Sequence, residues 1–387
     1  MLMMRRMRNV ARVGVVALTL GLWGCGGGEG TEGDPTGPGN TEPAPTLATV
    51  KTLEVRNILY HAVKVKGQLF SSGGAEVTER GVCWSAQANP TKSDNCVVHA
   101  GEEIEFTVEI KGLGSDSPYN ARAYAVNEYG TAYGENLSFR TLAEGTLPAS
   151  VDPLLESEWM VFQWPYNALY PQYTEEPNVN GHFGNPCGAT AFARILAYWK
   201  NEIQPTGTID AMNTWNDVRM QVDLDTVTVD YTNLPPTLGE DATYDEYKDV
   251  AKLFLMAGAI GLTNEMDVGT PGDPFIAALR RHLNVSGNVR FARRWEYSKE
   301  EWIALLKDEL AHGRPLMTAG RTADSPAPWE DGSVAGHWYN IDGYNEAGQF
   351  HIEYNIGGPG LPGYLDADQF GEYGSHNLVV VGFEPGE

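Results

Sequence analysis

Hydrophobic and polar residues alternate with a period of two across much of residues 49–142. The run 104–110 alternates in this way, as a strand with one buried face does. Its apolar residues are Ile104, Phe106, Val108 and Ile110. Similar short runs at 61–66 and 120–126 are separated by turn residues such as those at 71–74. The pattern predicts an all-β sandwich of about seven strands.

In the remainder of the chain, apolar residues recur every three or four positions, which is the period of a helix. A first helix is predicted at about 245–258. A second starts with Asp273 as its cap and Pro274 in its first turn, and a third starts with a capping box of Ser298 and Glu301. Strand-like runs follow at 315–318, 337–343, 349–354 and 378–382. A helical half followed by a β half predicts an α+β fold for this part.

Residues 1–24 have the organisation of a secretory signal. A basic start is followed by an apolar stretch at 13–22 that is too short to span a membrane. Leu22 and Gly24 ahead of Cys25 resemble a bacterial lipoprotein signal, in which the cysteine becomes the lipidated first residue. Trp23 departs from that pattern, and an ordinary signal peptide cleaved nearby is the alternative.

A Gly- and Pro-rich stretch at 25–48 follows the signal and predicts a flexible tether. No other stretch is long and apolar enough to cross a bilayer. We therefore expect contact with a membrane only through a lipid anchor. The expected location is the bacterial cell envelope, with the protein either anchored to the outer membrane or secreted.

The charge balance excludes one class of partner. Removal of residues 1–24 lowers Lys+Arg from 27 to 23 against 51 Asp+Glu, so the net charge changes from -24 to -28. Nucleic-acid binding needs positive charge to neutralise phosphates, so no nucleic-acid partner is expected. The acidic surface is interpreted as a solvated one.

The chain has four cysteines, Cys25, Cys83, Cys96 and Cys187. If Cys25 carries lipid and Cys83 pairs with Cys96 in the oxidising exterior, Cys187 is the remaining free thiol. Two separately buried thiols at 83 and 96 are the alternative, because the geometry that a disulfide requires is not visible in a sequence.

Cys187 follows Asn185-Pro186 and precedes apolar residues at helical spacing, which places it in the first turn of a helix. Unpaired backbone N–H groups and the helix dipole stabilise a thiolate there. A lone cysteine in a helix is more often a buried small hydrophobe, so a nucleophile also needs a base.

His337 is the predicted base. It begins a strand-like run 150 residues after Cys187, and papain-like enzymes take their base from a distant β segment at a comparable separation. His351 and His376 are the competing candidates. The sequence contains no His-Glu-x-x-His and no Cys-x-x-Cys, so neither a metal nor another cofactor is expected.

Four segments in order, 153–167, 185–200, 313–320 and 336–358, resemble the successive blocks of the streptopain family of papain-fold cysteine peptidases. In the earlier part of the chain, segments 73–85, 119–134 and 137–141 resemble a fibronectin type III-like module of bacterial surface proteins. These resemblances imply a multidomain chain. Its expected parts are the signal at 1–24, the tether at 25–48, a β-sandwich at 49–145 and a papain-like α+β peptidase domain at 150–387.

The resemblance implies a cysteine endopeptidase that acts on proteins or peptides as a monomer. Cys187 would be its nucleophile and His337 its general base. The Cys187 backbone N–H and the Gln163 side chain would hold the oxyanion, although Gln163 is displaced by an apparent one-residue insertion.

A second departure lies beside the expected base, where Ile356 replaces a tryptophan of the family pattern. Asn355 or Glu353 is then expected to orient His337. If neither does, the alternative is a catalytically impaired papain-fold protein that binds a partner at the cell surface.

Overall fold

The computed structural model describes residues 44–175, 178–213, 218–232, 234–262, 273–321, 336–356, 363–367, 370 and 375–386. At 213, 262, 273, 274, 375 and 376 it describes the backbone only. The predicted signal, Cys25 and most of the predicted tether lie outside the described residues, as does the side chain of His376. Within the described ranges, no helix has the length and apolar character needed to cross a membrane.

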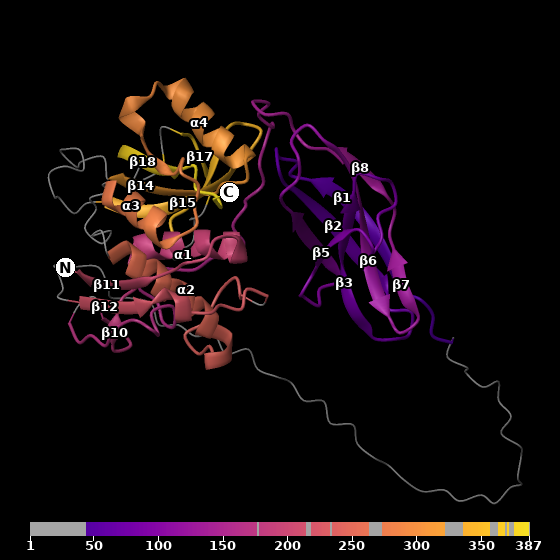
Figure 1. The fold of residues 1–387 in the computed structure, drawn as a ribbon, viewed down its shortest axis with the longest axis horizontal. Helices are drawn as coiled ribbons and strands as arrows, with labels where there is room; N and C mark the ends of the chain where they lie inside the picture. Colours follow the sequence, from indigo (N-terminus) through magenta and orange to yellow (C-terminus); the bar gives the residue numbers. More distant parts are fainter. Residues whose placement is uncertain are drawn as a thin grey trace, which may run out of the picture. The chain divides into compact units, whose positions relative to one another are not determined.

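The first part of the described chain forms two antiparallel sheets (Figure 1). One has the strand order β1-β2-β5, and the other has the order β4-β3-β6-β7 with β8 paired to β6. The strands are β1 (Thr49–Arg56), β2 (Val63–Ser71), β3 (Val77–Ser85), β4 (Asn95–Val98), β5 (Glu105–Ile110), β6 (Pro118–Asn127), β7 (Gly130–Tyr133) and β8 (Leu137–Arg140). The described part of this region therefore has eight strands, against the expectation of about seven.

The two sheets contribute to one hydrophobic core. Val65 and Val108 come from the three-stranded sheet, and Val82 and Ala123 come from the other. Full burial of a valine side chain contributes about 1.5–3 kcal/mol, so this shared core is what holds the two sheets together.

Strand β5 corrects one detail of the predicted alternation. Phe106, Val108 and Ile110 are buried as expected, but Ile104 is 65% exposed. The pairing of β2 with β5 ends at Glu105, so Ile104 lies beyond the strand and is not part of its buried face.

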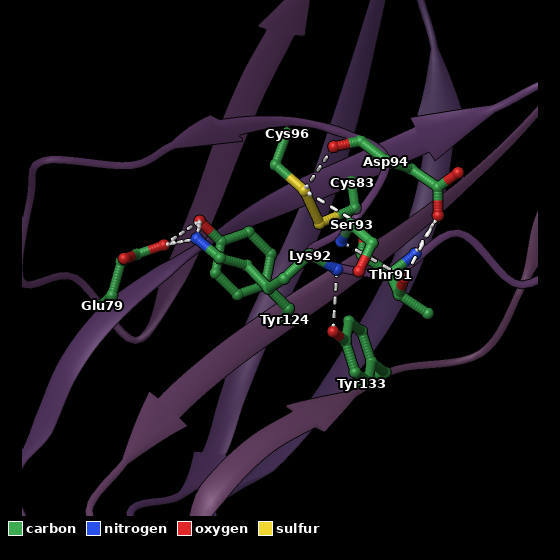
Figure 2. Close-up of a disulfide and its surroundings, with 9 residues drawn as sticks. All are labelled: Glu79, Cys83, Thr91, Lys92, Ser93, Asp94, Cys96, Tyr124 and Tyr133. Atoms are coloured by element: carbon green, nitrogen blue, oxygen red, sulfur yellow. Dashed lines mark hydrogen bonds and ion pairs between the residues drawn. A yellow bond between two sulfur atoms is a disulfide. The ribbon is translucent and has the colours of Figure 1, made fainter.

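Cys83 on β3 and Cys96 on β4 are directly opposite each other and form a disulfide (Figure 2). The cross-link closes the connection between the two strands. Lys92, in that connection, pairs with the carboxylate of Glu79 and lies 4.6 Å from the ring centroid of Tyr124. Closing a loop of this length stabilises the folded state by about 3 kcal/mol in the chain-entropy account.

The second part of the chain is built on a six-stranded antiparallel sheet with the order β13-β18-β14-β15-β16-β17. Its strands are β13 (Arg290–Arg293), β14 (Leu316–Arg321), β15 (Gly336–Tyr344), β16 (Phe350–Glu353), β17 (Gly363–Leu365) and β18 (Ser375–Val381). Four of them, β14, β15, β16 and β18, confirm the predicted strand-like runs to within a few residues.

Among the described residues, four helices accompany this sheet, namely α1 (Cys187–Trp199), α2 (Tyr244–Leu262), α3 (Asp273–His282) and α4 (Lys299–Ala311). All four confirm the predicted helices, and the capping box of Ser298 and Glu301 is formed in full. Helix α1 packs against α2 and against β14 and β15. In Figure 1 the sheet lies between α4 on one side and α1 with α2 on the other.

The helical half also contains strands that were not predicted. They form the hairpins β9 (Asn178–Val179) with β10 (His182–Phe183), and β11 (Thr208–Asn213) with β12 (Val218–Asp223). The signal for β12 was present in the sequence, because Val218, Met220 and Val222 alternate with polar residues and are all buried. Short 3-10 turns occur at Lys200–Glu202, Leu224–Thr226 and Arg294–Glu296.

Candidate active site

Cys187 is the first residue of α1, where the sequence placed it. Pro186 at the N-cap is extended and offers no side-chain cap, and the first turn has no acidic residue. The helix N-terminus is thus left with backbone N–H groups and a positive dipole end, both of which favour a thiolate. The backbone N–H of Trp338 donates to the Cys187 sulfur at 3.4 Å.

His337 precedes Trp338 on β15 and is buried, with 6% of its surface exposed. Its Nε2 lies 2.5 Å from the carbonyl oxygen of Tyr354. A carbonyl can only accept a hydrogen bond, so Nε2 must carry a proton in this contact. The neutral ring therefore keeps its lone pair on Nδ1.

The acceptor that faces His337 Nε2 is thus a backbone carbonyl, whereas the sequence suggested the side chain of Asn355 or Glu353. Asn355 uses Oδ1 to accept from Arg194 at 2.5 Å and Nδ2 to donate to Asn340 at 3.3 Å. The Glu353 carboxylate lies 3.5 Å from the same arginine. Both side chains thus contact the buried guanidinium of Arg194.

Gln163 lies in a loop that is fixed to the residue pair ahead of Cys187. Its backbone N–H donates to Asn185 Oδ1 at 3.1 Å, and the Phe162 N–H donates to the Asn185 carbonyl at 3.0 Å. Asn185 is fully buried and also donates through Nδ2 to the Met160 carbonyl. The side-chain Oε1 of Gln163 is buried with no hydrogen-bond partner among the described residues. The backbone of the loop is thus held in place by Asn185.

The same loop is also fixed to the segment that faces His337. The backbone N–H of Val161 donates to the carbonyl of Asn355 at 2.9 Å. Cys187, His337 and Gln163 therefore lie on three segments. The strand of His337 bonds directly to Cys187, and the Gln163 loop bonds to Asn185 ahead of Cys187. The segment Tyr354–Asn355 connects the Gln163 loop to His337. These are the residues that the sequence singled out, brought together from α1, β15 and a loop.

A group of charged side chains is linked to Asn355 through Arg194. Arg194 on α1 and Asp342 on β15 are almost completely buried, and Glu353 and His351 on β16 are mostly buried. Burial lowers the pKa of the Arg194 guanidinium, and burial raises the pKa of the Glu353 carboxyl despite the opposing charge of Arg194. Each charge is compensated by an opposite one, as buried ions require.

His351, a competing candidate for the base, belongs to this charged group. Its Nδ1 lies 2.6 Å from Asp342 Oδ1. Burial lowers the pKa of the His351 imidazole, but the hydrogen bond and charge of Asp342 outweigh burial and raise that pKa. Asp342 also accepts a hydrogen bond from the Leu155 N–H through Oδ2. The Asp342–His351 pair therefore connects β15 and β16 to the segment at Leu155.

Sequence reasoning missed three parts of the site. They are Arg194, the Asn185 side chain and the Tyr354 carbonyl. Arg194 left a signal, since it is the one charged residue within the largely apolar α1. Among the described residues, no group of three His, Cys, Asp or Glu side chains could hold a metal ion.

A cysteine at a helix N-terminus, faced by a histidine-bearing strand of an antiparallel sheet, defines a papain-like cysteine peptidase arrangement. The active interpain A cysteine protease of Prevotella intermedia has a similar structure, with a TM-score of 0.50 and 27% identity over 62% of this chain and 96% of that one.

A profile of the Peptidase C10 family matches residues 162–363, and the chain belongs to this family of cysteine peptidases. Streptopain of Streptococcus pyogenes is 23% identical over 314 residues, which span 72% of this chain and 75% of streptopain. The thiol protease/hemagglutinin PrtT of Porphyromonas gingivalis is 25% identical over 273 residues. That match spans 62% of this chain but only 28% of PrtT.

The raised pKa of His351 predicts a pH-dependent stability. A histidine with a raised folded-state pKa stabilises the fold when protonated, so its contribution is present below about pH 6.5 and is lost as the pH rises through the folded-state value. In the Cys187→Ala background, the free energy of unfolding by urea should fall between pH 6 and pH 8. Adding His351→Gln should flatten this fall.

His99→Gln is the matched control, because His99 pairs with the exposed Glu103 at the surface, where ion pairs contribute little. It should leave the pH dependence unchanged. If the free energy of unfolding fell as much with pH in the His351→Gln variant as without it, the Asp342–His351 pair would not be the source of the pH dependence.

Proposed function

We propose that the chain is a secreted or surface-anchored cysteine endopeptidase in which Cys187 is the nucleophile and His337 the general base. The observation that carries the proposal is the 3.4 Å hydrogen bond from Trp338 N–H to Cys187 Sγ. It holds the strand that bears His337 against a thiol at a helix N-terminus. Membership of a cysteine peptidase family supports the same chemistry.

In the first half of the reaction, His337 Nδ1 takes the thiol proton of Cys187. The resulting thiolate attacks the carbonyl carbon of a peptide bond. The helix N-terminus and the Trp338 N–H stabilise the sulfur's negative charge before attack. The imidazolium then gives its proton to the departing amine, and a thioester on Cys187 remains.

In the second half, His337 takes a proton from water as the water oxygen attacks the thioester carbonyl. Collapse of the tetrahedral intermediate breaks the carbon–sulfur bond, releases the carboxylic acid product and leaves the thiolate of Cys187 beside the imidazolium of His337, which is the resting pair. The Tyr354 carbonyl keeps the Nε2 proton in place throughout, so Nδ1 is the nitrogen that exchanges protons.

The negative oxygen of both tetrahedral intermediates needs hydrogen-bond donors. We assign these to the backbone N–H of Cys187 and the side-chain amide of Gln163. The hydrogen bond that fixes the Gln163 backbone supports this assignment, since a donor on a backbone that is already positioned needs less reorganisation when charge develops.

The nucleophile assignment predicts that Cys187→Ala abolishes casein cleavage by the secreted full-length chain. A thiol-directed epoxide should label Cys187 in the native wild-type protein much faster than in the denatured protein, because only the folded site activates the sulfur. Intact mass and peptide mapping report the label. A folded wild-type chain that labels no faster than its denatured form would contradict the proposal and favour a binding protein without catalysis.

The oxyanion assignment predicts that Gln163→Ala lowers kcat by about 10²–10³-fold with a small effect on KM, because the donor acts mainly in the transition state. Gln221→Ala is the matched control on the exposed face of β12, and it should retain wild-type kinetics. A Gln163→Ala variant with unchanged kcat would contradict the assignment of Gln163 as an oxyanion donor.

We further propose that the chain is exported, carries lipid on Cys25 and uses its fibronectin type III-like module as a spacer. Cells fed an alkyne fatty acid should incorporate the label into the wild-type protein and into Cys187→Ser, but not into Cys25→Ser. Mass measurement of the mature N-terminus completes the test. An unlabelled wild-type protein cleaved at another position would indicate an ordinary signal peptide instead.

A further inference from the structure

We infer that Arg194 is a positioning residue that fixes the backbone at Tyr354 and Asn355. It thereby holds the Tyr354 carbonyl, which faces His337, in a fixed position relative to the Gln163 loop. The inference rests on the proposed function and assigns a role to a buried cation that does not itself reach the reacting atoms.

Arg194 lies about two helical turns after Cys187 on α1 and is 1% exposed. Its Nε donates to Ser157 Oγ at 3.2 Å and its Nη1 donates to Asn355 Oδ1 at 2.5 Å. The same Nη1 lies 3.5 Å from Glu353 Oε2. Burying a guanidinium costs several kcal/mol, and these three partners are what offset that cost.

Asn355 is the residue through which Arg194 acts. Its φ is 59°, in the left-handed region that glycine and asparagine adopt most readily. Its side chain is held at both ends, by Arg194 and by Asn340. Its own carbonyl accepts the Val161 N–H, and the carbonyl just before it faces His337 Nε2. Asn355, held at both ends, therefore positions both the Gln163 loop and the carbonyl that faces His337.

Electrostatics reinforces the clamp. Glu353 is mostly buried near Asp342, and burial raises the pKa of its carboxyl, while the charge of Arg194 limits that rise. Without Arg194, Glu353 would be left beside Asp342 with His351 as its nearby cation, at 3.9 Å. The end of β16 would then relax, and Tyr354 and Asn355 follow directly on that strand.

The hydrogen bond from Trp338 to Cys187 does not involve Arg194. The thiol therefore keeps its position when the Arg194–Asn355 hydrogen bond is lost. The expected defect therefore lies in proton transfer and oxyanion stabilisation, not in substrate binding. A misplacement of about 1 Å at a reacting group can lower the rate by about 100-fold.

The test compares Arg194→Met and Asn355→Gly in the secreted full-length chain. Glycine keeps the left-handed backbone but removes the side-chain link, so Asn355→Gly keeps the inference testable if Arg194→Met folds poorly. Both variants should lower kcat by about tenfold or more with KM nearly unchanged. The double variant should be no slower than the slower single variant, because both changes break the same link.

Arg314→Met is the matched control, since Arg314 is also buried and pairs with Glu309 on α4 at 2.8 Å and with Glu384 at 3.1 Å, neither of which belongs to the site. It should lower the melting temperature while leaving kcat unchanged. Two results would overturn this inference while leaving the proposed function intact. In both, the wild-type chain is active. In the first, Asn355→Gly has the kcat of the wild-type chain, and in the second, the losses in the double variant are additive. A wild-type chain without Cys187-dependent cleavage would overturn the proposed function and this inference with it.

Discussion

The hydrogen bond between the Trp338 N–H and the Cys187 sulfur is the contact on which the site depends. It joins the first turn of α1 to the start of β15, two segments that lie 151 residues apart in the chain. The packing of α1 against β14 and β15 brings these segments together, and the fully buried Asn340 reinforces it by donating to the Ala191 carbonyl. The thiol is thus placed by the hydrophobic assembly of helix on sheet, and the polar contacts then adjust it.

Backbone groups do most of the fine positioning. The Tyr354 carbonyl faces His337, the Asn355 carbonyl holds the loop at Val161, and the Asn185 carbonyl holds the same loop at Phe162. Side chains enter as clamps on these backbone segments. These side chains are buried and polar, so their polar atoms need hydrogen-bond partners. The Arg194–Asn355 pair shows how one such interaction can connect several segments.

Much of this site could be predicted from the sequence, for physical reasons that differ between residues. Cys187 was predictable because a proline turn and an apolar helix flank it, and the α4 cap was predictable because its two side chains are close in sequence. The acceptor of His337 was not predictable, because a backbone carbonyl has no residue identity to recognise. Arg194 pairs with Asn355, which lies 161 residues further on, and only the packing of α1 against the sheet brings them together.

The central claim is that the Tyr354 carbonyl fixes the Nε2 proton of His337 and leaves Nδ1 to exchange a proton with Cys187. It is tested most directly by the imidazole ¹⁵N chemical shifts of His337 at neutral pH, assigned with a His337→Gln variant. The account predicts a doubly protonated ring in the wild-type chain and, in Cys187→Ala, a neutral ring with its proton on Nε2. A proton on Nδ1 in Cys187→Ala, or a neutral ring in the wild-type chain, would contradict it.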